Sequence, residues 1–573
     1  MAERARGGAP PQDRLLDRRL FLERMGMLTA AAAAGAGLAP PPLRAGVRPD
    51  PGRARLPRAD RIQATEPWEM TLAELATQIR ERRLAPSELV RAYLERIQAM
   101  DGVLSAFNTV RSDEALADAR ALDDVPWTGP LHGMPLAIKD NYYTRGMLTT
   151  ANSRIFADFV PGYDATAWAR LREGGAILLG KTQMGPLATT RATTPDGEAT
   201  TVNAWAPSDP AVDPGGSSSG SATAVAARLA ASSTGTQTGG SITNPASRQG
   251  LTGLKPTMGR VSLHGIIPLT YTRDHPGPIA RDARDAALML QAMAGPDPAD
   301  PRTLGLPPVP DYPRAAEPVE AGGSVRLRWP TTLGVPPGYL DVGEAEGGFR
   351  PRGRDADPAE RERRERVARE RREAEVAARR AMLAGFEALG ARVVEIELPE
   401  DWETLTGSDF NNVRLPERTE PFLRYLREDV RLFGVSLSPW INGLLLGGPE
   451  YLRGQRAKML LLERVLDGIF GQCDVVAQTS PIPFDIIGLP LIAFPIGFEA
   501  SRGTDLPVAG MFGGLPFGEE RLLSLAAAWQ ATTRWHRRRP PEVVEPAARQ
   551  GAREARSSRP PRLDALDVLA ECE

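Results

Sequence analysis

The spacing of apolar residues along the chain predicts helices and strands that alternate from about residue 68 onward. Thr71 and Glu74 have the three-residue spacing of a capping box, which marks the start of a helix. Apolar residues then recur on one helical face from about Ser87, so a second helix is expected there. By the same reasoning we expect strands at 135–138, 176–179 and 393–398, and helices at 167–173, 222–231 and 357–389. Strands alternating with helices imply an α/β fold whose sheet is covered by helices on both faces.

The chain has four compositional segments. A twin-arginine pattern at Arg18 and Arg19 precedes a short alanine-rich apolar stretch, so residues 1–45 are predicted to be a twin-arginine signal peptide. The alternative is an exposed arginine pair before a short alanine helix. Residues 46–67 form a linker, 68–540 the folded domain and 541–573 an arginine- and proline-rich tail. We therefore expect export by the twin-arginine route to the periplasm or the extracellular space.

Two further stretches within the domain have unusual compositions. Residues 296–353 are rich in proline and glycine and are expected to form loops. The helix at 357–389 has charges that alternate in sign, which favours a solvated helix face over a partner-binding arm.

Composition excludes several classes of function. The formal net charge is −2, from 70 basic and 72 acidic residues, so neither nucleic acid nor an anionic membrane is an expected partner. Only two cysteines and four histidines occur, so neither a disulfide framework nor a metal centre is expected. No cofactor is expected. A homodimer is compatible with the sequence.

Lys139 is the first candidate for chemistry, because it ends the apolar run at 135–138. Burial disfavours the charged form of a lysine, and a neutral amine can accept a proton. The lysine is therefore a candidate general base at the carboxyl end of a strand. The alternative is a lysine at the edge of the core, with a packed stem and a solvated head.

Two serines on glycine-rich segments are the other candidates. Ser241 follows Gly239 and Gly240, where backbone N–H groups can approach a developing oxyanion. Ser217 follows two glycines and precedes an alanine-rich helix. A flexible linker or an anion site at the helix N-terminus are the alternatives there. Residues 216–220 also match the nucleophile-elbow spacing, but the strand that this motif requires does not precede them.

Together these segments resemble the amidase signature family, almost continuously from 131 to 300 and more weakly over 71–107 and 488–533. The resemblance is carried by Leu-His-Gly-Met-Pro-Leu-Ala-Ile-Lys-Asp at 131–140, Gly-Gly-Ser-Ser-Ser-Gly at 215–220 and Gly-Thr-Gln-Thr-Gly-Gly-Ser-Ile at 235–242. It implies the amidase-signature fold, with one large, mixed, twisted sheet between helices.

The resemblance also implies a Ser–Ser–Lys triad. Ser241 would be the nucleophile, Lys139 the base, and Ser217, after a cis peptide bond, the proton relay between them. Backbone N–H groups of Thr238, Gly239, Gly240 and Ser241 would form the oxyanion hole.

The sequence departs from the family pattern beside the nucleophile. Gln237 stands where an aspartate is usual and Thr243 where an arginine is usual, so one charge of each sign is missing. Ser219 replaces a glycine, and Pro186 stands where a glutamate is common. These departures affect the expected loop geometry and substrate choice rather than the triad.

The expected function is therefore an exported amidase, a hydrolase of linear carboxylic amides that acts through an acyl-enzyme on Ser241. Its partner would be a small amide substrate, whose binding residues the sequence does not identify. Two alternatives stay open. One is an amidotransferase subunit that passes ammonia from glutamine to a partner-bound acceptor, against which the leader argues. The other is a non-catalytic binding protein on the same scaffold.

Overall fold

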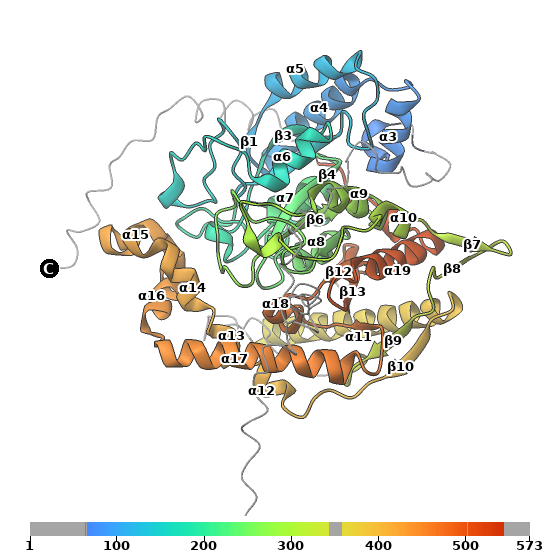
Figure 1. The fold of residues 1–573 in the computed structure, drawn as a ribbon. Coiled ribbons are helices and arrows are strands. Elements are labelled where there is room, and N and C mark those ends of the chain that lie inside the picture. Colours follow the sequence, from blue (N-terminus) through green and yellow to red (C-terminus); the bar gives the residue numbers. More distant parts are fainter. Residues whose placement is uncertain (1–63, 65, 343–357, 501, 544–573) are drawn as a thin grey trace, which may run out of the picture.

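The computed structural model describes residues 64, 66–342, 358–500 and 502–543. The expected signal peptide, nearly all of the linker and most of the tail lie outside these residues. At the centre is an eleven-stranded sheet with the order β1-β3-β2-β4-β6-β5-β12-β13-β11-β9-β10, and helices flank it (Figure 1). The predicted α/β fold with a large mixed sheet is confirmed.

The strands of this sheet are mostly short. They are β1 (Phe107–Val110), β2 (Pro135–Lys139), β3 (Ile177–Thr182), β4 (Ser232–Gln237), β5 (Thr252–Lys255), β6 (His275–Ala280), β9 (Thr332–Val335), β10 (Arg392–Glu395), β11 (Val475–Ala477), β12 (Leu491–Glu499) and β13 (Leu506–Gly514). A separate hairpin consists of β7 (Val319–Ala321) and β8 (Ser324–Arg326).

The α-helices vary widely in length. They are α3 (Leu72–Arg80), α4 (Pro86–Leu104), α5 (Ser112–Asp123), α6 (Thr166–Glu173), α7 (Ser219–Ala226), α8 (Thr243–Gln249), α9 (Ala283–Met293), α10 (Tyr312–Ala315), α11 (Pro358–Ala388), α12 (Trp402–Thr406), α13 (Ser408–Asn412), α14 (Leu415–Thr419), α15 (Leu423–Glu428), α16 (Leu437–Leu445), α17 (Gly448–Arg464), α18 (Ile482–Ile487) and α19 (Glu519–Thr532). The expected capping box is present, because the Thr71 and Glu74 side chains each accept a hydrogen bond from the other residue's amide.

The strand directions place the candidate residues at one edge of the sheet. β2 pairs in parallel with β3 on one side and with β4 on the other, whereas β6 pairs antiparallel with β4. Lys139 ends β2 and Gln237 ends β4. Because carboxyl ends of parallel strands meet at the same edge, the base candidate and the nucleophile loop at 238–241 are brought together.

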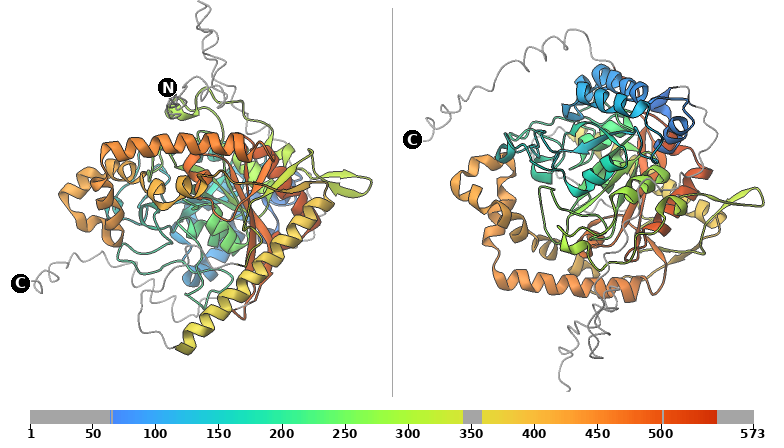
Figure 2. Two further views of the ribbon diagram at one scale, coloured as in Figure 1. Left: turned by 90° about the horizontal axis from the view of Figure 1, so that it is seen from below. Right: turned by 45° about the horizontal axis from the view of Figure 1, so that its top comes forward.

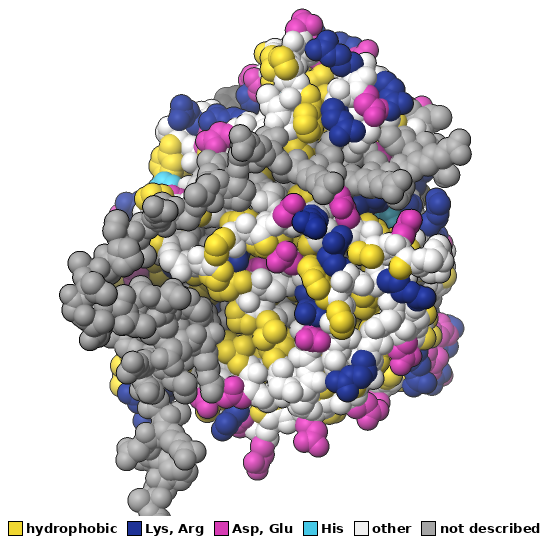
Figure 3. Space-filling model, turned by 45° about the vertical axis from the view of Figure 1, so that its right-hand side comes forward, with side chains coloured by type: hydrophobic (Ala, Val, Ile, Leu, Met, Phe, Trp, Pro, Cys, Tyr) yellow, Lys and Arg dark blue, Asp and Glu magenta, His cyan; other side chains and the backbone are white. Residues whose placement is uncertain are grey.

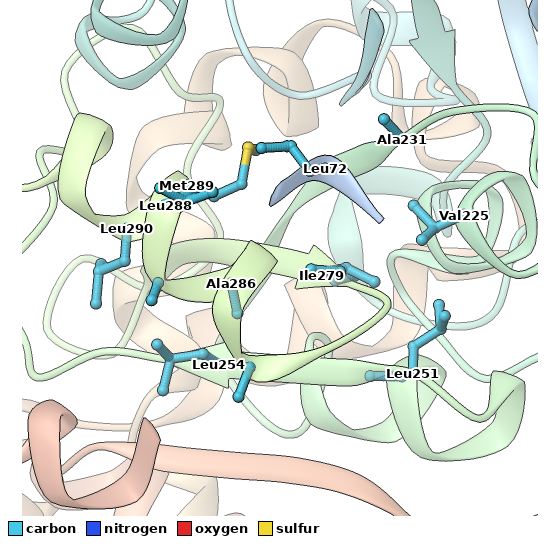
Figure 4. Close-up of a cluster of buried hydrophobic side chains, with 14 of the residues drawn as sticks. Leu72, Val225, Ala231, Leu251, Leu254, Ile279, Ala286, Leu288, Met289 and Leu290 are labelled. Carbon is cyan, nitrogen blue, oxygen red and sulfur yellow. The ribbon is translucent and has the colours of Figure 1, made fainter. Parts of the chain in front are cut away.

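The largest part of the hydrophobic core is one cluster of buried side chains from both halves of the chain. Side chains from α3, α9 and neighbouring strands gather in it, including Leu72, Leu254, Ile279 and Ala286 (Figure 4). The long helix α11 packs against β12 and β13 and runs along one side of the molecule (Figure 2, left). The helices from α12 to α17 form an extension on one side of the molecule (Figure 1). On the face shown in Figure 3, basic and acidic side chains are interspersed.

Two sequence-based expectations need correction. The helix expected at 222–231 is α7, which ends at Ala226, because Arg228 turns the chain with a φ of 63° and the Ala231 amide bonds to Pro135 O of β2 at 3.0 Å. Sheet pairing thus overrides the helix propensity of alanine. The region expected to be loops contains the short helix α10, the hairpin β7–β8 and the strand β9, which lies within the sheet between β11 and β10. Prolines on both sides of β9 conceal its signal.

Candidate active site

Lys139 lies at the centre of the candidate site. Its side chain is fully buried, and its Nζ donates to Ser217 Oγ at 2.9 Å and to Thr236 Oγ1 at 2.9 Å. Asn141 Nδ2 also donates to Thr236 Oγ1, at 3.1 Å. The lysine therefore contacts one of the two predicted serines directly, although 78 positions separate them in the sequence.

Burial sets the protonation of this lysine. Loss of hydration lowers the pKa of Lys139 to about 7, and the negative charge of Asp274 opposes that shift. No carboxylate of the described residues forms an ion pair with its Nζ within 4.0 Å. An amine with this pKa is largely neutral just above pH 7, as a general base must be.

Ser217 is positioned by the two glycines before it. The Gly216–Ser217 peptide bond is cis, as the resemblance implies. Gly215 has a φ of 81°, and a Cβ there would lie 2.4 Å from Pro245 Cα, while one on Gly216 would lie 2.6 Å from Arg191 Cα. Only glycine fits such close backbone approaches. The Ser217 side chain is consequently held, 1% exposed, against Lys139.

Ser241 lies beside the same segment and is 8% exposed. Its carbonyl oxygen accepts a hydrogen bond of 2.6 Å from Ser218 Oγ, which fixes the nucleophile loop against the segment that carries Ser217. Within the described residues, no hydrogen bond joins the Ser217 and Ser241 hydroxyls. The link from Lys139 to Ser217 is therefore in place, and the link from Ser217 to Ser241 stays a prediction.

The predicted oxyanion donors fall into two groups. The Gly240 N–H donates to Asp485 Oδ2 at 2.8 Å, so in this structure it is committed to a carboxylate and is not free for a substrate oxygen. The amides of Thr238, Gly239 and Ser241 have no hydrogen-bond partner among the described residues, and Gly239 is exposed. These three N–H groups are the ones that the structure leaves available to an oxyanion.

Three buried residues around the site were missed by sequence reasoning. The Thr236 hydroxyl accepts a hydrogen bond from Lys139 Nζ, and Asp274 accepts one from Thr238 Oγ1. Asp485 accepts hydrogen bonds from the Gly240 amide and from the Gln237 side chain. Thr236 could have been found from its place two residues before the Thr-Gly-Gly-Ser loop. Nothing in the sequence connects Asp485 with a loop some 245 residues earlier.

A buried ion pair supports the end of β2. Lys181 Nζ lies 3.2 Å from Asp140 Oδ1, and the two side chains are 0% and 1% exposed. We expect Lys181→Met to lower the free energy of unfolding by about 3–5 kcal/mol, because it leaves the Asp140 charge buried and unpaired. Urea denaturation measures this change. The matched control is Arg366→Met, which removes an exposed pair with Glu370 and is expected to change little. Equal midpoints for the Lys181 variant and the wild type would contradict the prediction.

The site has no metal-binding group in the described part of the chain, where no cluster of three or more His, Cys, Asp or Glu residues could hold an ion. In the same residues, no helix is long and apolar enough to cross a membrane.

Comparisons with known proteins show the family to which this chain belongs. A family model described as Amidase matches residues 88–328. The chain is 34% identical over 529 residues to the A subunit of glutamyl-tRNA(Gln) amidotransferase from Moorella thermoacetica, covering 83% of this chain and 99% of that protein. The corresponding protein of Azoarcus sp. is also 34% identical, over 82% of this chain and 99% of its own length.

Solved structures agree. The native peptide amidase of Stenotrophomonas maltophilia has a TM-score of 0.65 and 29% identity, covering 83% of this chain and 98% of that one. The chain therefore belongs to the amidase signature family, whose enzymes act on carbon–nitrogen bonds. This confirms the resemblance read from the motifs.

Proposed function

We propose that this chain cleaves the C–N bond of a carboxylic amide through an acyl-enzyme on Ser241. The observation that carries the proposal is the contact of 2.9 Å between Lys139 Nζ and Ser217 Oγ, made by a fully buried amine. Ser241 Oγ attacks the amide carbon while its proton passes through Ser217 to Lys139. The proton then goes to the departing amine, and water hydrolyses the ester on Ser241.

The second candidate is an amidotransferase subunit that releases ammonia from glutamine for a partner-bound acceptor. The names of the curated relatives favour this candidate over a free-standing amidase. The peptide amidase among the solved structures favours independent hydrolysis. Both candidates use the same chemistry at Ser241 and differ in the fate of the nitrogen. Export by the twin-arginine route belongs to the amidase proposal. It stays a proposal, because the predicted leader lies outside the described residues.

One experiment separates these candidates. The full chain, purified with anything that remains bound to it, is supplied with glutamine and with a panel of carboxylic amides of varied acyl chain and amine, and the products are measured. An amidase releases carboxylic acid and amine from panel members without a partner. A component of an amidotransferase co-purifies with other chains and acts on glutamine. A non-catalytic binding protein hydrolyses nothing and leaves Ser241 unlabelled by a fluorophosphonate probe.

The pH dependence of the reaction tests the role of the lysine. Because the neutral amine is the active form and the pKa of Lys139 is about 7, kcat/KM is expected to rise with pH through about 7 and then to level off. The rise follows from loss of a proton by the free enzyme, so its midpoint reports this pKa. A rate that is independent of pH over this range would contradict a base with this pKa.

A further inference from the structure

Two buried polar side chains contact the nucleophile loop without reaching the proposed reacting atoms. Gln237, at the end of β4, accepts hydrogen bonds with its Oε1 from the amides of Ile242 and Thr243, each at 2.9 Å. Its Nε2 donates to Asp485 Oδ1 at 2.8 Å. The other carboxylate oxygen of Asp485 accepts the Gly240 N–H at 2.8 Å. Gln237 and Asp485 are both fully buried.

These hydrogen bonds hold the loop that carries Ser241 on both sides of the serine. The loop is held before the serine through Gly240, and after it through Ile242 and Thr243, with the Gln237–Asp485 bond joining the two sides. The segment that leads into α18, the helix of Asp485, also packs on the loop. A Cβ on Gly240 would lie 3.1 Å from Pro481 Cγ, just before this helix.

The charge of Asp485 is balanced inside the protein. Lys255 Nζ lies 3.5 Å from Asp485 Oδ1, both side chains are fully buried, and Nζ also donates to the Phe484 carbonyl at 3.3 Å. The charges that the family usually carries at positions 237 and 243 are absent here. A buried pair on other elements, Asp485 and Lys255, lies next to the same loop instead.

We propose that Asp485 is a positioning residue for the nucleophile, which acts through Gln237 and the Gly240 amide to fix the loop 238–241. The proposal rests on the function proposed above. It assigns Asp485 a second effect, because the Gly240 N–H that it holds leaves Thr238, Gly239 and Ser241 as the amides free to bind an oxyanion. Asp485 takes no part in proton transfer.

The pattern of donors and acceptors makes the proposal specific. Asp485→Asn keeps the shape but offers one oxygen and one NH₂ group, so either the Gly240 N–H or the Gln237 NH₂ faces another donor. Gln237→Glu places two carboxylates against each other in the core. In the double variant, the introduced glutamate accepts from the Ile242 and Thr243 amides and from the NH₂ group of the introduced asparagine. The asparagine oxygen accepts from Gly240, so the hydrogen bonds to the loop are restored with the two groups exchanged. The contact of Lys255 Nζ with this position is not restored, because an NH₂ group replaces the oxygen that faces the lysine.

The test is this exchange, made in the full chain. We expect each single variant to lower kcat by about 10- to 100-fold with KM changed less than about threefold, since a misplaced nucleophile weakens the chemical step more than binding. The double variant is expected to recover to within about fivefold of the wild type. The rate of Ser241 labelling by a fluorophosphonate is expected to follow the same order. A role confined to stability would lower the melting temperature and leave kcat and the labelling rate of the folded single variants unchanged.

Two outcomes would overturn the proposal: wild-type kcat and labelling in Asp485→Asn, or a folded double variant no faster than the slower single variant. If Asp485→Asn does not fold, Gln237→Met carries the test, because it keeps the Asp485–Gly240 bond and removes the link across the loop. An unchanged kcat in that variant overturns the proposal as well. Failure of the proposed function is a separate result, since wild-type protein would then neither hydrolyse amides nor label at Ser241.

Discussion

Ser241→Ala is expected to lower amide turnover by about three to six orders of magnitude and to abolish labelling by a fluorophosphonate. Without the hydroxyl no acyl-enzyme can form, and only binding and oxyanion stabilisation remain. The fold should be retained, because the Ser241 side chain makes no hydrogen bond among the described residues and its carbonyl, which accepts from Ser218, is unchanged.

The measurement is steady-state hydrolysis together with mass spectrometry of the labelled protein. Ser247→Ala is the matched control, since Ser247 lies on α8, is only partly buried and is not part of the proposed site. The control should label and turn over normally. If Ser241→Ala still labelled, or if the control lost its label, the nucleophile would be a different residue.

Replacing Lys139 is expected to reduce kcat/KM by about 10²- to 10⁴-fold, the usual contribution of a general base. Lys139→Met removes the amine but fills the buried space with an apolar chain, so Ser217 loses its 2.9 Å contact while the packing is preserved. The rise of activity near pH 7 should disappear with the lysine.

Lys139→Ala provides the matched comparison, because it leaves a space that a small alkylamine can enter. Added propylamine is expected to restore part of the rate in Lys139→Ala and none in Lys139→Met, whose side chain occupies the site. Near-normal turnover in either variant would refute the assignment of Lys139 as the base. If propylamine restored activity equally in both variants, the added amine would be acting from bulk solvent and not from the space that the lysine leaves.

Local signals indicated much of the fold in advance. The capping box at Thr71 and Glu74, the apolar run that ends at Lys139 and the charged helix now seen as α11 were each readable from a few neighbouring residues. Strand β9 was not, because a four-residue strand between prolines is recognisable only through its parallel partners β10 and β11. The local propensity of the alanine-rich residues 227–231 predicts a helix, but in the folded chain the Ala231 amide bonds to β2, and this pairing overrides the propensity.

Lys139, Ser217 and Ser241 could be named as candidates without coordinates, because the order and spacing of three short motifs carry the family resemblance, whereas each motif alone has a structural alternative. Only the folded chain shows which groups surround them. Folding brought Thr236 and Asp274 to the lysine and to the loop, and it joined Asp485 to Gly240 and Gln237 across some 245 residues of chain. The physical reason is that a buried polar group must find a partner wherever the fold supplies one, and sequence distance carries no information about that partner.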